Sequence, residues 1–148
     1  MERRVGTVLA QVARLMRRAF DGRAREIGVT RPQWLVLSVL QRYEGIKQGG
    51  LADILEVEPI TAGRMIDRMQ EAGLVERRAD PADRRAWRLY LTGRGREITE
   101  RLQPLASETS SEALRGVSED ETAELLRILD KMLENLTGRA ADTGSQND

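Results

Sequence analysis

Two groups of side chains in this 148-residue chain have the types and the spacing to do chemistry. The first group is Thr61, Arg64 and Arg68, whose i, i+3, i+7 spacing would place them on one face of a helix. The second is the adjacent pair Arg84 and Arg85 in a turn-rich segment. The planar guanidinium of arginine matches phosphate oxygens and the edge of guanine, and a short hydroxyl near a helix start suits the same ligands. These residue types indicate contact with a nucleic acid.

A structural alternative exists for each group. The helix could have a solvated face on which Arg64 pairs with Asp67, or Arg68 with Glu71. The arginines of the turn could form an exposed charge cluster with Asp83 that contributes little to stability.

The elements that would position these residues are a helix and a hairpin. Pro59 opens an amphipathic helix that ends at Gly73, and strands are expected over 74–77 and 86–91, joined by the sequence ADPADRR. With a short helix before it, this order is the layout of a winged helix-turn-helix. A helix fits the major groove of DNA, and a hairpin beside it can reach the phosphates or the minor groove.

The short helix is expected over 48–55, with Val57 and Glu58 in the tight turn that follows it. Lys47 and Gln48 lie at its start and could touch backbone phosphate. The alternative is that these two residues belong to an ordinary surface loop and contact no phosphate.

Further helices flank the winged unit, so the predicted fold class is mainly α with a small β-hairpin wing. Thr30 is a good N-cap, Ser118 and Glu121 form a capping box, and Pro104 is expected to kink or briefly break its helix. The polar tail after Gly138 is expected to be disordered. The predicted flanking helices run from Val5 to near Gly28, from Thr30 toward Tyr43, from Thr92 to about Leu114, and from Ser118 to Leu136.

The first helix and the last two have apolar stripes without a partner in a small monomeric core. Exposed stripes of this kind usually form an interface, so these helices are expected to pair with those of a second copy. Two-fold symmetry would in turn predict a palindromic DNA site. The expected organisation is a dimerisation helix over 1–29, the winged region over 30–95, dimerisation helices over 96–137 and the tail over 138–148.

Composition excludes several classes of function. The chain has no Cys and no His, which removes disulfides, thiol-based sensing, the commonest metal ligand and the commonest general base, so catalysis, metal binding and a cofactor are not expected. No stretch approaches the roughly 20 apolar residues of a membrane span, and a cytoplasmic protein is predicted. The net charge of zero divides into +7 over residues 1–96 and −7 over 97–148, so only the first part offers a surface for phosphate.

The sequence resembles the MarR family of bacterial transcription regulators, and within it the branch similar to the SlyA regulators. The resemblance covers roughly residues 8–136. Its motifs are TRPQWLVLSVL for the second helix and EAGLVERRADPADRRAWRLYLT for the wing, where an Asp, one residue, an Arg and a terminal Leu-Thr appear as Asp83, Arg85, Leu91 and Thr92.

The resemblance implies roles for several residues. Asp83 would orient Arg85, and Arg84 or Arg85 would enter the minor groove, favouring narrow A·T-rich flanks. The family's small-molecule cleft would lie near three residues whose guanidinium and indole groups suit an aromatic carboxylate; the alternative is that the indole belongs to the core and the arginines to ion pairs between subunits. These three residues are Arg14, Arg17 and Trp34.

The leading functional hypothesis is a dimeric DNA-binding regulator that acts as a repressor and is released from its operator by a small aromatic or phenolic acid. The second hypothesis is a DNA-binding regulator or anti-silencer without a ligand. A third class, an enzyme or a helical adaptor, lacks support, because no catalytic cluster or phosphate-binding loop occurs and an adaptor would not need an arginine-bearing hairpin.

Overall fold

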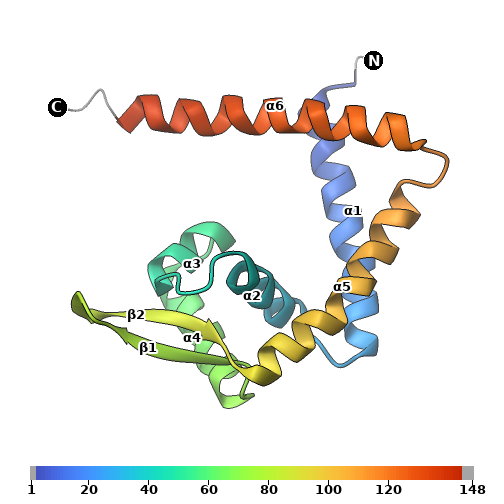
Figure 1. Ribbon diagram of the computed structural model, residues 1–148. Coiled ribbons are helices and arrows are strands. Elements are labelled where there is room, and N and C mark those ends of the chain that lie inside the picture. Colours follow the sequence, from blue (N-terminus) through green and yellow to red (C-terminus); the bar gives the residue numbers. More distant parts are fainter. Residues whose placement is uncertain (1–2, 145–148) are drawn as a thin grey trace. The chain divides into compact units, whose positions relative to one another are not determined.

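The computed structural model describes residues 3–144, with side chains as far as residue 138, and contains helices and one antiparallel hairpin (Figure 1). The chain divides into two compact units, residues 1–109 and 110–148, each described here by itself. The predicted fold class is confirmed. In chain order the elements are α1 (Val5–Glu26), α2 (Arg31–Arg42), α3 (Gln48–Leu55), α4 (Pro59–Glu71), β1 (Val75–Asp80), β2 (Asp83–Leu91), α5 (Gly93–Ala113) and α6 (Glu119–Gly144).

Local capping signals mark the ends of several of these helices. The Thr30 side chain accepts a hydrogen bond from the Gln33 amide, and the Gln33 side chain accepts one from the Thr30 amide, which is a capping box at the start of α2. Ser118 and Glu121 form the same reciprocal pair at the start of α6. The chain leaves α4 through Gly73, whose φ of 74° is in the left-handed region.

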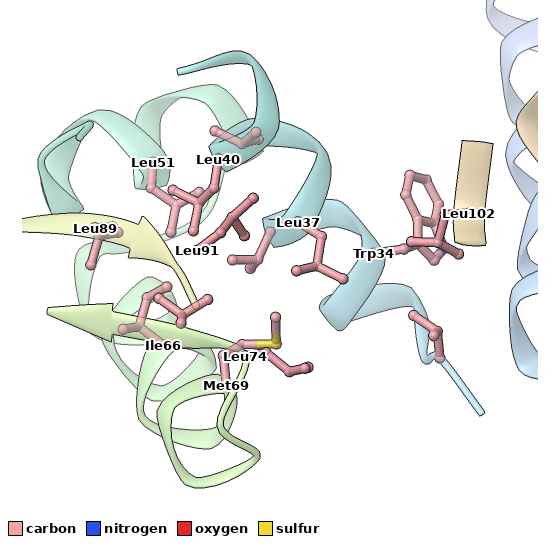
Figure 2. Close-up of a cluster of buried hydrophobic side chains, with 14 of the residues drawn as sticks. Trp34, Leu37, Leu40, Leu51, Ile66, Met69, Leu74, Leu89, Leu91 and Leu102 are labelled. Carbon is pink, nitrogen blue, oxygen red and sulfur yellow. The ribbon is translucent and has the colours of Figure 1, made fainter. Parts of the chain in front are cut away.

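The core of the first unit lies among α2, α3, α4 and the hairpin (Figure 2). Helix α4 contributes Ala62, Ile66 and Met69, which share one face and are at most 2% exposed. Fully burying one such large apolar side chain stabilises the fold by roughly 1.5–3 kcal/mol, so this face fixes α4 against the rest of the unit. The other large side chains that are buried most completely are Val36, Leu37, Leu40, Leu51, Val75 and Leu89.

Helix α5 begins in close contact with the entry to the hairpin. The Thr92 hydroxyl donates to the Gly73 carbonyl (2.6 Å) and accepts from the Gly95 amide (3.0 Å), while the Thr92 amide donates to the Leu74 carbonyl (3.1 Å). A Cβ atom on Gly95 would lie 2.1 Å from that same carbonyl oxygen. Only glycine therefore allows this approach of helix to strand.

Three details differ from the sequence-based expectations. Helix α5 continues through Pro104 without a break, because its neighbouring side chains Leu102 and Leu105 pack on the core and outweigh one lost hydrogen bond. Helix α6 extends to Gly144, since Arg and Ala after Gly138 favour helix; residues 145–148 of the expected disordered tail lie outside the described residues. The strands are longer than expected and the turn between them is only Pro81 and Ala82.

Candidate nucleic-acid interface

Helix α4 presents the predicted polar face to solvent. Thr61, Arg64 and Arg68 are all exposed, on the side away from the buried residues of the same helix. In the part of the chain that the structure describes, no ion pair or side-chain hydrogen bond engages these arginines; the carboxylate of Asp67 pairs instead with Arg77. Both guanidinium groups are therefore available to a ligand.

The register of the hairpin explains where the second pair of arginines lies. Ala79 faces Trp87, whereas the next residue, Asp80, faces Asp83. The β2 residues Arg84, Arg85 and Ala86 consequently have no counterpart on β1 and form a bulged, exposed tip. A bulge re-aims the side chains that it contains, and here it displays both arginines of the tip.

Asp83 contacts the backbone of the bulge. Its carboxylate accepts a hydrogen bond from the Arg85 amide at 3.0 Å, as in an Asx turn. If Asp83 orients Arg85, as the family resemblance implies, it does so through the main chain. The Arg85 guanidinium itself has no partner among the described residues.

At the base of this tip lies a buried carboxylate that the sequence analysis treats only as a turn residue. Asp80 is 4% exposed and lies 3.2 Å from the Arg88 guanidinium and 3.7 Å from the Lys47 ammonium. The hydrogen bond from the Ala82 amide, and then the charges of Arg88 and Lys47, hold the pKa of Asp80 below its usual value although burial raises it. Asp80 therefore stays ionised and joins the hairpin to the segment before α3.

Lys47 also belongs to the hairpin through its backbone, because it forms an isolated antiparallel bridge with Arg88. The Lys47 side chain is about half exposed, and its ammonium group lies 3.7 Å from the Asp80 carboxylate. The neighbouring Gln48 is partly buried, and its side-chain oxygen accepts from Arg77. Both predicted residues thus lie beside the wing, in contact with residues that the sequence analysis does not single out.

Arg77 is the other residue that the sequence analysis misses. It contacts residues of α3 and α4 from its position on β1. A signal for it does exist in the sequence: strand side chains alternate, and Arg77 is two residues from the buried Val75, so it shares the core side of the hairpin.

The three residues proposed to hold an aromatic acid are not brought together by any contact within residues 3–138. Trp34 is 8% exposed, packs edge-on against Phe20 at a centroid distance of 4.8 Å, and donates its indole N–H to Asp21 at 2.7 Å. Arg14 and Arg17 are exposed on α1. Trp34 is therefore a core residue in this unit, as in the alternative interpretation of the sequence.

Asp21, beside the indole, also accepts from the Arg31 guanidinium at 2.8 Å. Burial by itself raises the pKa of Asp21, but the hydrogen bonds from Arg31 and Trp34 outweigh it and lower the pKa on balance. The group next to Trp34 is thus a carboxylate that is already paired.

A small open pocket of about 110 Å³ lies nearby, between α1, α2 and α5. Its polar lining is neutral, consisting of hydroxyls and amides, and the Ser38 and Thr99 hydroxyls already donate to backbone carbonyls. The lining residues are Phe20, Leu37, Ser38, Gln41, Thr99, Leu102, Gln103 and Ala106.

Among the described residues, no group of three or more acidic, His or Cys side chains is arranged to hold a metal ion. No helix there is both long and apolar enough to cross a membrane.

Known proteins share both the sequence pattern and the fold. A sequence model of the MarR family matches residues 29–87. The crystal structure of wild-type MarR from E. coli in its apo form is similar with a TM-score of 0.81 and 27% identity, over 90% of this chain and 99% of that one. A MarR transcriptional regulator from Methanosarcina mazei gives a TM-score of 0.81 and 26% identity, over 90% and 96% of the two chains.

A third similar structure is a mutant MarR from E. coli complexed with operator DNA, with a TM-score of 0.73 and 28% identity over 87% of this chain and 93% of that one. The matched segment 29–87 runs from α2 to the middle of β2 and so includes α4 and the bulged tip. Together, the sequence match over residues 29–87, the winged helix and the likeness over nine-tenths of the chain make this protein similar to the MarR family of regulators.

Proposed function

We propose that this chain is a dimeric transcriptional regulator that binds a palindromic operator in duplex DNA, with α4 in the major groove and the hairpin tip in the minor groove. The observation that carries the proposal is a set of exposed arginines that form no hydrogen bond or ion pair with any described residue, Arg64 and Arg68 on α4 and Arg84 and Arg85 on the bulge. Similarity to a mutant MarR that was crystallised in complex with operator DNA supports binding to an operator, and the groove assignments follow from the shapes of the helix and the hairpin. Such a regulator acts in the cytoplasm, associated with the nucleoid when bound.

The chemistry of each contact follows from its position. Arg64 lies near the start of α4, where a guanidinium can reach N7 and O6 of guanine in the major groove. Arg84 and Arg85, on a protruding bulge, suit the narrow minor groove, where the negative potential is strongest. Thr61, Lys47 and Gln48 would contact backbone phosphate, and Asp83 would hold the bulge through the Arg85 amide.

Dimerisation is proposed from the apolar surface of α6. None of its described side chains is buried, although the helix has leucines and an isoleucine along one stripe. Soluble monomers rarely expose a contiguous apolar stripe of this length. The members that are at least 42% exposed are Leu125, Leu126, Ile128, Leu133 and Leu136.

Salt titration separates the two kinds of DNA contact. The probes are a duplex that the wild-type protein selects from a randomised library and a shuffled duplex of the same composition. We expect Arg85→Ala to weaken binding and to lower the slope of log K against log salt by about one unit per site, because a guanidinium that displaces counterions in the minor groove is lost. Arg64→Ala should instead reduce the preference for the selected duplex, by roughly 1–3 kcal/mol if the contact with guanine is bidentate.

The dimer mass and helix content of both variants should match the wild type, because both side chains are exposed and neither forms a hydrogen bond or ion pair with another described residue. If Arg85→Ala binds the selected duplex as tightly as wild type at every salt concentration, the hairpin tip is not a DNA contact. If the wild-type protein selects no duplex from the library, the proposed function itself fails.

Two forms of regulation are compatible with this function. The first is repression relieved by a small aromatic or phenolic acid bound near Arg14, Arg17 and Trp34, which requires different affinities of the ligand for two spacings of the winged units. The second is regulation or anti-silencing without a ligand, within the branch similar to the SlyA regulators. The engaged indole of Trp34 and the paired carboxylate of Asp21 favour the second form.

Titration with salicylate-like acids decides between these forms. Under the form without a ligand, we expect unchanged tryptophan fluorescence and unchanged affinity for the selected duplex across a panel of such acids. Quenching in the wild type that is lost in Arg14→Ala and accompanied by weaker DNA binding would favour release by a ligand.

A further inference from the structure

Arg77 joins the hairpin to both helices of the helix-turn-helix. Its guanidinium donates to the Gln48 side-chain oxygen at 3.3 Å, to the Gln70 side-chain oxygen at 2.9 Å and to the Gly63 carbonyl at 3.2 Å. It also lies 2.7 Å from the Asp67 carboxylate, and its side chain is only 18% exposed. In the register of the hairpin Arg77 is opposite the fully buried Leu89, so its side chain lies on the core side.

The residues of α4 that Arg77 holds form a stripe of their own. Gly63, Asp67 and Gln70 recur at i, i+4 and i+7, which places them on one side of the helix. Arg64 directly follows Gly63, and Arg68 directly follows Asp67. Together with the buried face of α4, the contacts of Arg77 thus restrict the rotation of α4 about its axis, and with it the direction of both exposed arginines.

Arg77 also determines the orientation of the Gln48 amide. Arginine has donors only, so the Gln48 oxygen must face it and the Gln48 NH₂ group must face away. That NH₂ group lies against α4, where a Cβ on Gly63 would be 3.2 Å from it. Glycine at position 63 therefore lets α3 and α4 approach closely enough for one guanidinium to bind both.

We propose that Arg77 is a positioning residue, one that orients α4 and the Gln48 amide for reading DNA without itself contacting DNA. This inference rests on the proposed function and adds a specific role within it. Bidentate recognition of a base edge depends on direction as well as distance, whereas attraction to phosphate tolerates small rotations. Loss of Arg77 should therefore reduce sequence discrimination more than it reduces binding to DNA in general.

The test compares Arg77→Met with Arg78→Met, which removes the same charge from the next residue of β1. Arg78 is exposed and stacks on Tyr90 at 4.0 Å from the ring centroid, with no contact to α3 or α4 among the described residues. For Arg77→Met we expect the ratio of affinities for the selected and shuffled duplexes to fall about tenfold, with the wild-type salt slope. Arg78→Met should keep the wild-type ratio.

Gly63→Ala gives a second and independent measurement with Arg77 intact. Alanine favours a helix over glycine, so loss of folding is not expected, but the added methyl group must displace the Gln48 amide. We expect a reduced affinity ratio at an undiminished melting temperature, a combination that a merely structural role would not produce.

Two outcomes would overturn the inference. If Arg77→Met weakens binding to both duplexes equally and lowers the salt slope by about one, Arg77 is a phosphate contact. If Arg77→Met and Gly63→Ala both retain the wild-type ratio, the contacts of Arg77 do not orient the reading face. Both outcomes presuppose that the wild type prefers its selected duplex; absence of that preference would refute the proposed function instead.

Discussion

Gly95→Ala is expected to destabilise the first unit more than a Gly→Ala substitution at any other described glycine of that unit. The new Cβ would lie 2.1 Å from the Leu74 carbonyl oxygen and 3.1 Å from its carbon. Both are backbone atoms of a residue that is 4% exposed, so no side-chain rotation can relieve the clash. The start of α5 or the entry to β1 must move, which breaks the hydrogen bond between Thr92 and Leu74.

The expected cost is roughly 2–3 kcal/mol, at the upper end of overpacking effects because backbone must shift. Urea denaturation of Gly95→Ala followed by circular dichroism measures it as a lower midpoint with an unchanged slope. Gly93→Ala is the matched control, since a Cβ there meets nothing within 4 Å. Equal stability of the two variants would mean that α5 and the hairpin do not approach each other as closely as described.

The second large effect is loss of the dimer, which we expect when a single charged residue is introduced into the apolar stripe of α6. In a two-fold dimer each substitution occurs twice, so Leu133→Lys would place two lysines in the interface proposed above. Burial of unpaired charges costs several kcal/mol, and we expect the variant to be a monomer at micromolar concentration. Because α6 has no buried side chain of its own within the described residues, the first unit should keep its helix content.

Monomerisation should also weaken binding to a palindromic duplex by about 10²-fold or more, since the second half-site is no longer bound at high effective concentration. Light scattering and a mobility-shift titration measure the two effects. Glu134→Lys introduces a lysine at the neighbouring exposed position, on the side of the helix away from the stripe, and should leave both unchanged. A dimeric Leu133→Lys with wild-type affinity would exclude this stripe of α6 as the interface.

The sequence by itself determined the elements that depend on local chemistry. Thr30 and Ser118 cap α2 and α6 as expected, Pro59 opens α4, and Gly73 ends it. Each of these signals acts within a few residues through a side-chain hydrogen bond or a restricted φ, so a single sequence contains all the necessary information. The same locality made the exposed face of α4 predictable, since only helical periodicity is involved.

The tertiary structure decided which polar residues the site actually joins. Asp80 looks like an ordinary turn residue in the sequence. In the structure it is buried and forms ion pairs with Lys47 and Arg88, which lie outside the turn. Trp34 looks suited to an aromatic ligand, but its indole N–H already donates a hydrogen bond to Asp21 of α1. In both cases the deciding partner comes from another element, and a sequence pattern does not record which element packs on which.

The hairpin shows the same division within one element. Alternating residues predicted two strands, yet the bulge that displays Arg84 and Arg85 depends on pairing between strands, where Ala79 faces Trp87 and the following residue faces Asp83. Strand alternation predicts that Arg77 lies on the core side of the hairpin, but its partners on α3 and α4 follow only from packing. Local periodicity therefore determined what each residue could do, and non-local contacts decided which of them are held in place and which are left free to bind.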